Sequence, residues 1–171
     1  MKSFKLTAAF FGVAVLLAAG CAAEKKQEYD GEKSAASYAD ILEQNPNGVL
    51  ATRKGEQLRT QIMSFQFVEG NRIYFCTGSE KPLYEQLLRF PYVSYCTWPE
   101  DFEPVLSMNG KVVFTDDMPL KERVFSGTGY ASDFIRRHYK STDNPNLKLF
   151  YIEVEEIETY GTGGPKIYKA R

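Results

Sequence analysis

Histidine and cysteine are scarce in this chain of 171 residues, which has one histidine, His138, and three cysteines. Their number and spacing give no signal for a metal site or for a histidine-dependent catalytic triad. We therefore expect no metal, and a surface or helix-packing role for His138. Long apolar runs are also missing. No stretch reaches the roughly 20 apolar residues that a membrane-spanning helix needs. The 21 basic and 22 acidic residues are nearly balanced, which gives no signal for nucleic acid.

The N-terminus has the pattern of an export signal. Two lysines precede an uncharged stretch from Leu6 to Ala19, and small residues stand directly before Cys21. This order resembles the lipobox of bacterial lipoproteins, so we expect residues 1–20 to be removed and Cys21 to be lipidated. The alternative is ordinary signal cleavage near Ala19, which would release a soluble protein.

The mature chain is expected to be one domain on a tether. Residues 21–36 are polar and charged and show no apolar periodicity, which is typical of a flexible linker. Residues 37–171 have the usual size of a single domain and enough apolar side chains for one core. We expect this domain to be exported and held at a membrane by its lipid alone, facing the periplasm or the cell exterior.

Alternating apolar residues and turn signals predict a mainly β (α+β) domain, a small antiparallel barrel with short covering helices. Six strands are predicted, at Val49–Arg53, Arg59–Val68, Arg72–Thr77, Tyr92–Trp98, Val105–Phe114 and Leu147–Val154. Four short helices are predicted, over Tyr38–Glu43, over about Glu80–Arg89, after Asp117 and over Ala131–Tyr139. The acidic run Glu153–Glu158 is interpreted as the solvated edge of the last strand.

The segment from Tyr74 to Pro82 is the most informative part of the sequence, because a predicted strand turns directly into a helix there. Backbone N–H groups of a first helical turn lack partners, and the helix dipole favours an anion. Thr77, Ser79 and Lys81 add two hydroxyls and an ammonium group, so this junction could hold a phosphate. The competing interpretation is that Ser79 only caps the helix and that Lys81 points into solvent.

Arg59 favours the phosphate interpretation. The turn at 69–71 predicts a hairpin between the strands Arg59–Val68 and Arg72–Thr77. That register would bring Arg59 beside Cys76 and Thr77, where a guanidinium could bind the same phosphate through two hydrogen bonds.

Cys76 and Cys96 both fall in predicted strands, so a disulfide between them is one alternative. Buried free thiols are the commoner arrangement.

An ordered set of segments resembles the pyridoxamine 5'-phosphate oxidase-like family of FMN-binding split barrels, from about Ser37 to Gly164. The segments that carry the resemblance are Arg59-Thr-Gln-Ile-Met-Ser64, Ile73-Tyr-Phe-Cys-Thr77, Ser79-Glu-Lys-Pro-Leu-Tyr-Glu-Gln-Leu-Leu88 and Pro91-Tyr-Val-Ser-Tyr95. The resemblance implies a six-stranded antiparallel split barrel and a homodimer with two FMN molecules at the subunit interface.

The resemblance also implies which residues hold the cofactor. Thr77, Ser79 and Lys81 would bind the phosphate, and Trp98 and the segment 105–107 would approach the flavin from later strands. The residues expected along the flavin ring are Arg59, Thr60, Gln61, Ile62 and Met63, with Cys76 close by.

The departures from the family pattern are as informative as the matches. The true oxidase has an arginine where this chain has Glu80, a substrate-binding lysine where it has Ser64, and a C-terminal arginine motif that is absent here. We therefore expect an FMN-dependent oxidoreductase or electron-transfer lipoprotein other than the oxidase itself, with no catalytic residue identified. Because soluble nicotinamide nucleotides are not expected outside the cytoplasm, its electron donor would be a protein or a membrane-soluble molecule.

Two other functions remain open at the level of sequence. The barrel could be a binding module for haem, a deazaflavin or another ligand without turnover, with His138 as the sole histidine available to haem. Alternatively, the chain could be a purely structural surface lipoprotein, in which Lys81 and Arg59 have no ligand.

Overall fold

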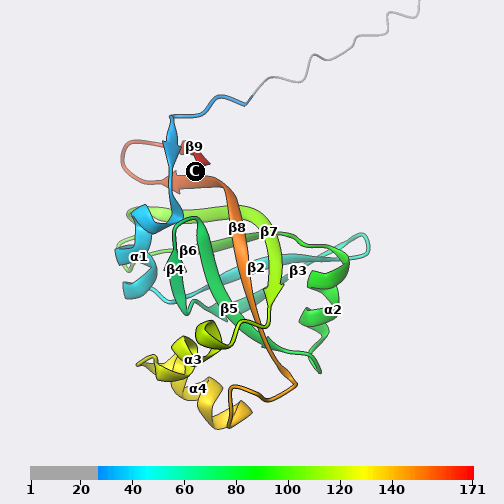
Figure 1. Cartoon of the computed structure of the whole chain (residues 1–171). Helices are drawn as coiled ribbons and strands as arrows, with labels where there is room; N and C mark the ends of the chain where they lie inside the picture. Colours follow the sequence, from blue (N-terminus) through cyan, green and yellow to red (C-terminus); the bar gives the residue numbers. More distant parts are fainter. Residues whose placement is uncertain (1–26) are drawn as a thin grey trace, which may run out of the picture.

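A computed structural model describes residues 27–171 (Figure 1). The predicted signal segment 1–20, the lipid at Cys21 and the start of the linker lie outside these residues. The described strands are β1 (Glu32–Lys33), β2 (Asn47–Lys54), β3 (Gln57–Ser64), β4 (Phe67–Glu69), β5 (Arg72–Gly78), β6 (Tyr92–Thr97), β7 (Val105–Thr115), β8 (Leu147–Tyr160) and β9 (Lys166–Ala170). The helices are the 3-10 helix η1 (Ala35–Tyr38) and α1 (Ala39–Gln44), α2 (Pro82–Arg89), α3 (Met118–Ser126) and α4 (Tyr130–Tyr139).

The strands form one sheet that curves into a split barrel. Along the sheet the order is β1-β9-β8-β7-β6-β2-β3, and β5 pairs with β8 and with β4. All neighbours are antiparallel except β1 and β9. In Figure 1, α3 and α4 lie together at one end of the barrel, and β1 and β9 lie at the other. The predicted mainly β class with short covering helices is confirmed.

The predicted strand Arg59–Val68 is in fact two strands with different partners, and this corrects the predicted hairpin. The backbone N–H of Phe65 donates to Pro46 O at 2.6 Å, whereas that of Gln66 donates to Tyr74 O at 2.9 Å. The chain therefore leaves β2 and joins β5 between these two residues. Only the short β4 forms the hairpin with β5, while β3 pairs along its whole length with β2.

The core has two parts because β5 is buried on both faces. Ile73 and Phe75 point into the barrel and belong to its main apolar cluster. Tyr74 and Cys76 point the other way, into a second cluster beneath α3 and α4 that includes Val124. This second cluster fixes the two helices over the outer face of β5. Both described cysteines, Cys76 and Cys96, are free thiols.

The folded domain begins earlier than predicted. Ala35 is completely buried, and Ser34 accepts a hydrogen bond from Ala36 N at the start of η1. Residues Glu32 and Lys33 form β1 beside β9. The assignment of all residues up to 36 to a linker was therefore wrong. The buried side chain of Ala35 and the pairing of Glu32 and Lys33 with β9 hold this segment to the domain, although most of its residues are polar or charged.

The last predicted strand is longer than expected, and it continues through the acidic run. Val154 and Ile157 are buried within it, whereas Glu153 and Glu155 are exposed. This part of β8 is not an edge, because it pairs with β7 and with the unpredicted β9. Within residues 27–171, no group of acidic, cysteine or histidine side chains could hold a metal ion. No helix in the same range has the length and apolar character needed to cross a membrane.

Candidate functional site

The junction between β5 and α2 leaves the start of the helix open. The N-cap residue of α2 is Lys81, which makes no side-chain capping bond, and Pro82 follows it in the first turn. Ser79 is not the cap, because its backbone N–H donates to Asn146 O at 2.9 Å and its hydroxyl donates to Asn146 Oδ1 at 3.1 Å. The interpretation of Ser79 as the helix cap is therefore wrong.

A cavity of about 300 Å³ opens beside this junction, between the edge of the barrel and α4. It brings together four of the residues predicted to bind the cofactor, which come from β3, β5 and the start of α2. These four are Ile62, Met63, Cys76 and Lys81. The opposite wall is made by α4, chiefly by Tyr130, Phe134 and Tyr139.

Two residues of the cavity wall, Tyr139 and Gln66, each carry a polar atom that is shielded from solvent and has no partner among the described residues. The hydroxyl of Tyr139 and Oε1 of Gln66 are buried and accept or donate no hydrogen bond within the described part of the chain. A buried polar atom without a partner costs about 1–3 kcal/mol, so such groups usually mark a missing ligand or water. A cavity with a mixed polar and apolar lining and one cation is suited to an organic molecule with an anionic group.

Burial determines the chemistry of Cys76. Loss of water raises the pKa of its thiol to about 12, and the nearby Lys121 only partly opposes this effect. The thiol therefore stays protonated at neutral pH and serves as a wall of the cavity, since a nucleophile would have to be a thiolate.

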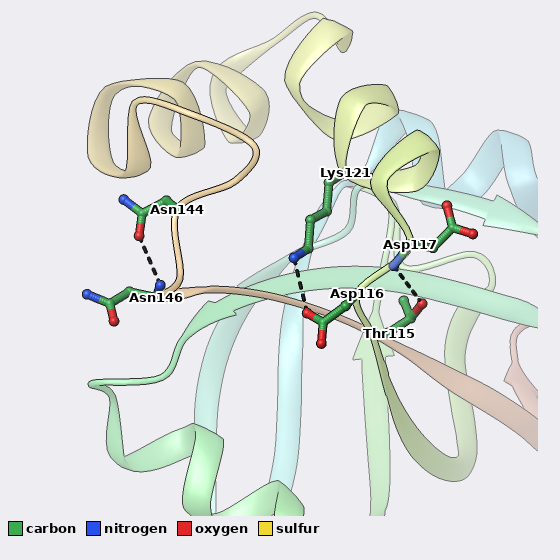
Figure 2. A network of polar contacts seen from close by, with 6 residues as sticks. All are labelled: Thr115, Asp116, Asp117, Lys121, Asn144 and Asn146. Atoms are coloured by element: carbon green, nitrogen blue, oxygen red, sulfur yellow. Dashed lines mark hydrogen bonds and ion pairs between the residues drawn. The ribbon is translucent and has the colours of Figure 1, made fainter.

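An ion pair between a buried lysine of α3 and an exposed carboxylate links this helix to the end of β7 (Figure 2). Figure 2 shows Lys121 extending from α3 toward Asp116, just after the end of β7. Lys121 is 7% exposed, and its Nζ lies 3.1 Å from Asp116 Oδ1. The hydrogen bond from Lys121 lowers the pKa of the Asp116 carboxyl. The Asp117 carboxylate caps α3 by accepting from Leu120 N at 3.0 Å.

Other predicted residues lie away from the cavity. The Arg59 guanidinium is exposed and donates to Gln57 Oε1 at 2.8 Å. Because Arg59 pairs with Thr52 across β2 and β3, the register that placed it beside Cys76 and Thr77 is wrong. Thr60 is also exposed, and neither it nor Gln61 lines the cavity.

Thr77 and Trp98 also lie outside the cavity lining. Thr77 is 3% exposed and pairs with Lys148 on β8. Trp98 is exposed and stacks on Phe102 at 6.1 Å between ring centroids. Of the three residues predicted to bind the phosphate, Thr77, Ser79 and Lys81, only Lys81 lines the cavity.

Sequence reasoning missed the contribution of α4. Tyr130, Phe134 and His138 recur every four residues and stack along its surface, with centroid distances of 6.5 and 5.7 Å. Lys81 Nζ lies 5.9 Å from the centre of the Phe134 ring. His138 packs on the helix surface as expected and does not line the cavity. The four-residue spacing was the available signal for this aromatic face.

Glu80 introduces a negative charge at the junction. Its carboxylate lies 3.8 Å from Nε2 of His138. It also folds against Gly78, and a β-carbon at that position would require the carboxylate to move. A carboxylate therefore lies at the surface of the strand–helix junction, on the residue before Lys81.

A second cavity of about 460 Å³ adjoins the first and shares Gln66, Tyr130 and Ala131 with it. Phe65 and Phe67 contribute apolar walls, and the Arg123 guanidinium lies 4.0 Å from the centre of the Phe67 ring. The two cavities therefore share part of one wall.

Comparison with known proteins agrees with the fold. Residues 35–161 match the family model of pyridoxamine 5'-phosphate oxidase. Among curated proteins, no sequence matches the chain.

Three solved structures illustrate the likeness. General stress protein 26 from Bacillus anthracis is 19% identical with a TM-score of 0.66, over 78% of this chain and 96% of that one. A pyridoxamine 5'-phosphate oxidase-related, FMN-binding protein from Nostoc punctiforme is 14% identical with a TM-score of 0.55, over 78% and 86%. A heme-binding protein from Mycobacterium smegmatis is 14% identical with a TM-score of 0.62, over 75% and 55%. The first two structures share the fold over most of both chains. The match to the family model over residues 35–161 shows that this chain belongs to the pyridoxamine 5'-phosphate oxidase family.

Proposed function

We propose that this protein binds FMN in the cavity between β3, β5 and α4 and acts as a flavin-dependent redox protein. One observation carries the proposal: Ile62, Met63, Cys76 and Lys81, expected from the sequence to bind the cofactor, line one cavity beside an uncapped helix start. The FMN-binding relative from Nostoc punctiforme supports the same cofactor.

The chain's own residues would divide the work between the two parts of the cofactor. The Lys81 ammonium and the free N-terminal end of α2 would hold the dianionic phosphate. Ile62 and Met63 on one side and Phe134 on the other would exclude water from the flavin ring. FMN, when bound, accepts and donates hydride or single electrons through its own ring system, so the protein needs no acid–base pair.

The same site argues against oxidation of pyridoxamine phosphate by this protein. Ser64, which lines the cavity, is short and uncharged and cannot replace a substrate-binding lysine. Glu80 adds a carboxylate where a second cation would favour a phosphorylated substrate. The substrate or electron partner would therefore differ from that of the oxidase.

A second copy of the chain would complete the cofactor site. Leu58 and Ile62 on β3 are 81% and 79% exposed, and Tyr92 on β6 is 64% exposed. Leu58 and Tyr92 line an open groove of about 470 Å³ on the outer face of the sheet. Large apolar side chains this exposed on a sheet face are typical of an interface, and a homodimer would cover them.

The lipid anchor is part of the proposal. Export through residues 1–20 and acylation of Cys21 would hold the domain at a membrane outside the cytoplasm. The electron donor would then be a protein or a membrane-soluble molecule. Recovery of wild-type protein with membranes, and release of a Cys21→Ser variant, would test the anchor.

The cofactor is tested by its identity in the purified protein. We expect a yellow protein with the absorption bands of a flavin, and FMN as the molecule released on denaturation. Reduction of this flavin by NADH, by NADPH or only by an artificial or protein donor then separates a reductase from an electron carrier. A colourless protein that binds no added FMN, or one that releases haem, would contradict the proposal.

A further inference from the structure

Three aromatic side chains are exposed on neighbouring segments of the barrel, and none of them lines the two cavities beside α4. Trp98 and Phe102 lie in the connection between β6 and β7, where their rings stack at 6.1 Å between centroids. Tyr160 ends β8 and pairs with Val105 at the start of β7. The exposed fractions of Trp98, Phe102 and Tyr160 are 39%, 60% and 58%. We call these three residues the aromatic patch.

The local structure does not account for the exposed rings. Phe102 has a φ of 56°, a conformation that glycine or asparagine adopts at lower cost than a bulky residue. The backbone N–H of Thr162 donates to Glu103 Oε1 at 2.7 Å, which ties this connection to the one between β8 and β9. Large apolar side chains that are exposed together usually mark a contact surface.

The N-terminal segment lies at the same end of the barrel. The Asp30 backbone N–H donates to Ile167 O at 2.6 Å, and the Asp30 carboxylate accepts from Ile167 N at 2.8 Å. Ile167 pairs with Glu158, two residues before Tyr160 on β8. Ordinary strand spacing and rise place the backbones of Asp30 and Tyr160 about 12 Å apart. The segment that leads to Cys21 is therefore held close to the aromatic patch.

Further contacts hold this segment against β8. Gln27 Nε2 donates to Glu156 Oε2 at 2.7 Å, and Asn109 Nδ2 donates to Glu156 Oε1 at 3.0 Å. The chain from Cys21 to Gln27 spans at most about 22 Å even when fully extended. A lipid on Cys21 would therefore keep this end of the barrel near the membrane, whereas α3 and α4 lie at the opposite end (Figure 1).

Resting on the proposed lipid anchor, we propose that the aromatic patch lies in the headgroup region of the bilayer that holds the Cys21 lipid. Tryptophan and tyrosine are enriched at membrane interfaces, because each side chain has an apolar body and a polar group. Lys166 is exposed and pairs with Thr159, the residue before Tyr160, so it adds a cation that anionic lipids attract. The patch is then a second membrane contact, which fixes the orientation of the domain.

The proposed dimer would leave this patch free. Its face includes Tyr92 at the start of β6, whereas Trp98 follows the end of the same strand. A strand of 6 residues is about 20 Å long. With the patch at the membrane, the cavity beside α4 lies at the end of the barrel away from the lipid (Figure 1). This orientation favours a protein over a membrane-soluble molecule as the electron partner.

Trp98 is the only tryptophan of the chain, so its fluorescence reports on the patch directly. The acylated protein is reconstituted in vesicles of phosphatidylethanolamine and phosphatidylglycerol, with or without bromine on the acyl chains. Because contact with bromine quenches indole emission, we expect brominated lipid to reduce Trp98 emission by about half. The double variant Phe102→Ser/Tyr160→Ser keeps the probe and should show roughly threefold less quenching. Leu88→Ser, at a 55% exposed position on α2, is the matched control and should be quenched as the wild type is.

The outcomes separate this inference from the proposed function. Equal Trp98 emission in both kinds of vesicle, with the protein still anchored, would overturn the membrane contact and leave the anchor standing. Unchanged quenching in the double variant, or an equal loss in Leu88→Ser, would also overturn it. Emission that neither brominated lipid nor aqueous iodide quenches would overturn it in favour of a second protein copy covering the patch. Wild-type protein without a lipid, recovered away from membranes, would refute the proposed anchor and this inference with it.

Discussion

Glu80 and Lys81 are consecutive residues of opposite charge at the start of α2. The Lys81 side chain reaches the cavity, whereas the Glu80 carboxylate folds over Gly78 and pairs with His138. At a phosphate site the two would act in opposite directions, because the carboxylate repels the anion that the ammonium attracts. Glu80 is thus expected to limit the affinity for a phosphorylated ligand.

Replacement of Glu80 by glutamine tests this opposition, because it removes the charge and keeps the shape. We expect Glu80→Gln to bind FMN about three- to tenfold more tightly at low salt, with a smaller gain at high salt. Fluorescence titration of cofactor-free protein measures the change, and riboflavin affinity should not move. Glu85→Gln, at an exposed position of the same helix, is the control. Unchanged or weaker FMN binding by Glu80→Gln would contradict the account.

At the scale of elements, the strands were predictable because their apolar and polar residues alternate in step with buried and exposed positions. Leu50 and Tyr95 are completely buried and lie at positions where the strand pattern required core residues. The crossing at Phe65 and Gln66 was not predictable, because apolar residues continue to alternate across it. The change of partner is visible only in long-range backbone bonds, from Phe65 to Pro46 and from Gln66 to Tyr74.

The site residues that lie close together in the sequence could be predicted, whereas those that come from a distant element could not. Lys81 and Cys76 follow from a strand that turns into a helix, which is a pattern within ten residues. Tyr139 and Phe134 reach the same cavity only because α4 packs over the second apolar cluster. Arg59 was misplaced for the related reason that β3 pairs with β2 and not with β5.

The ion pair between Lys121 and Asp116 gives α3 a measurable dependence on pH. In the Asp116→Asn variant the 7% exposed Lys121 loses its carboxylate. Because the Asp116 side chain is 82% exposed, we expect the free energy of unfolding at neutral pH to fall by only about 1–2 kcal/mol. Urea unfolding measures this loss.

The sign of the pH effect follows from the lowered pKa of Asp116. The pKa of the Asp116 carboxyl is lower in the folded protein than in the unfolded chain, where it is about 3.9. The ion pair therefore stabilises the fold fully at a pH above the unfolded pKa. This contribution is lost as the pH falls through the folded pKa. The difference between wild type and Asp116→Asn should therefore shrink below about pH 4. Asp40→Asn, at an exposed site outside the described ion pairs, should show no such difference. A constant difference from pH 7 to pH 3 would argue against the ion pair.

At the scale of the whole molecule, the split barrel leaves one sheet face with exposed apolar side chains. Leu58, Ile62 and Tyr92 would be covered in a homodimer. We expect Leu58→Glu to convert the proposed dimer into a monomer, because two charges would be buried at the interface. Light scattering after gel filtration measures the mass, and circular dichroism checks the fold. Leu88→Glu, at a 55% exposed position on α2, should remain dimeric. A wild-type monomer would exclude this interface. A dimer unaffected by Leu58→Glu would place the interface elsewhere.

The central claim is that a cofactor phosphate lies at the start of α2 beside Lys81, and the affinity of a Lys81→Ala variant for FMN tests it most directly. We expect roughly ten- to a hundredfold weaker binding than in the wild type, the effect of losing one charge-assisted hydrogen bond. Lys140→Ala, which removes an exposed lysine just beyond α4, should bind FMN as the wild type does. Equal FMN affinity in wild type and Lys81→Ala would contradict the account.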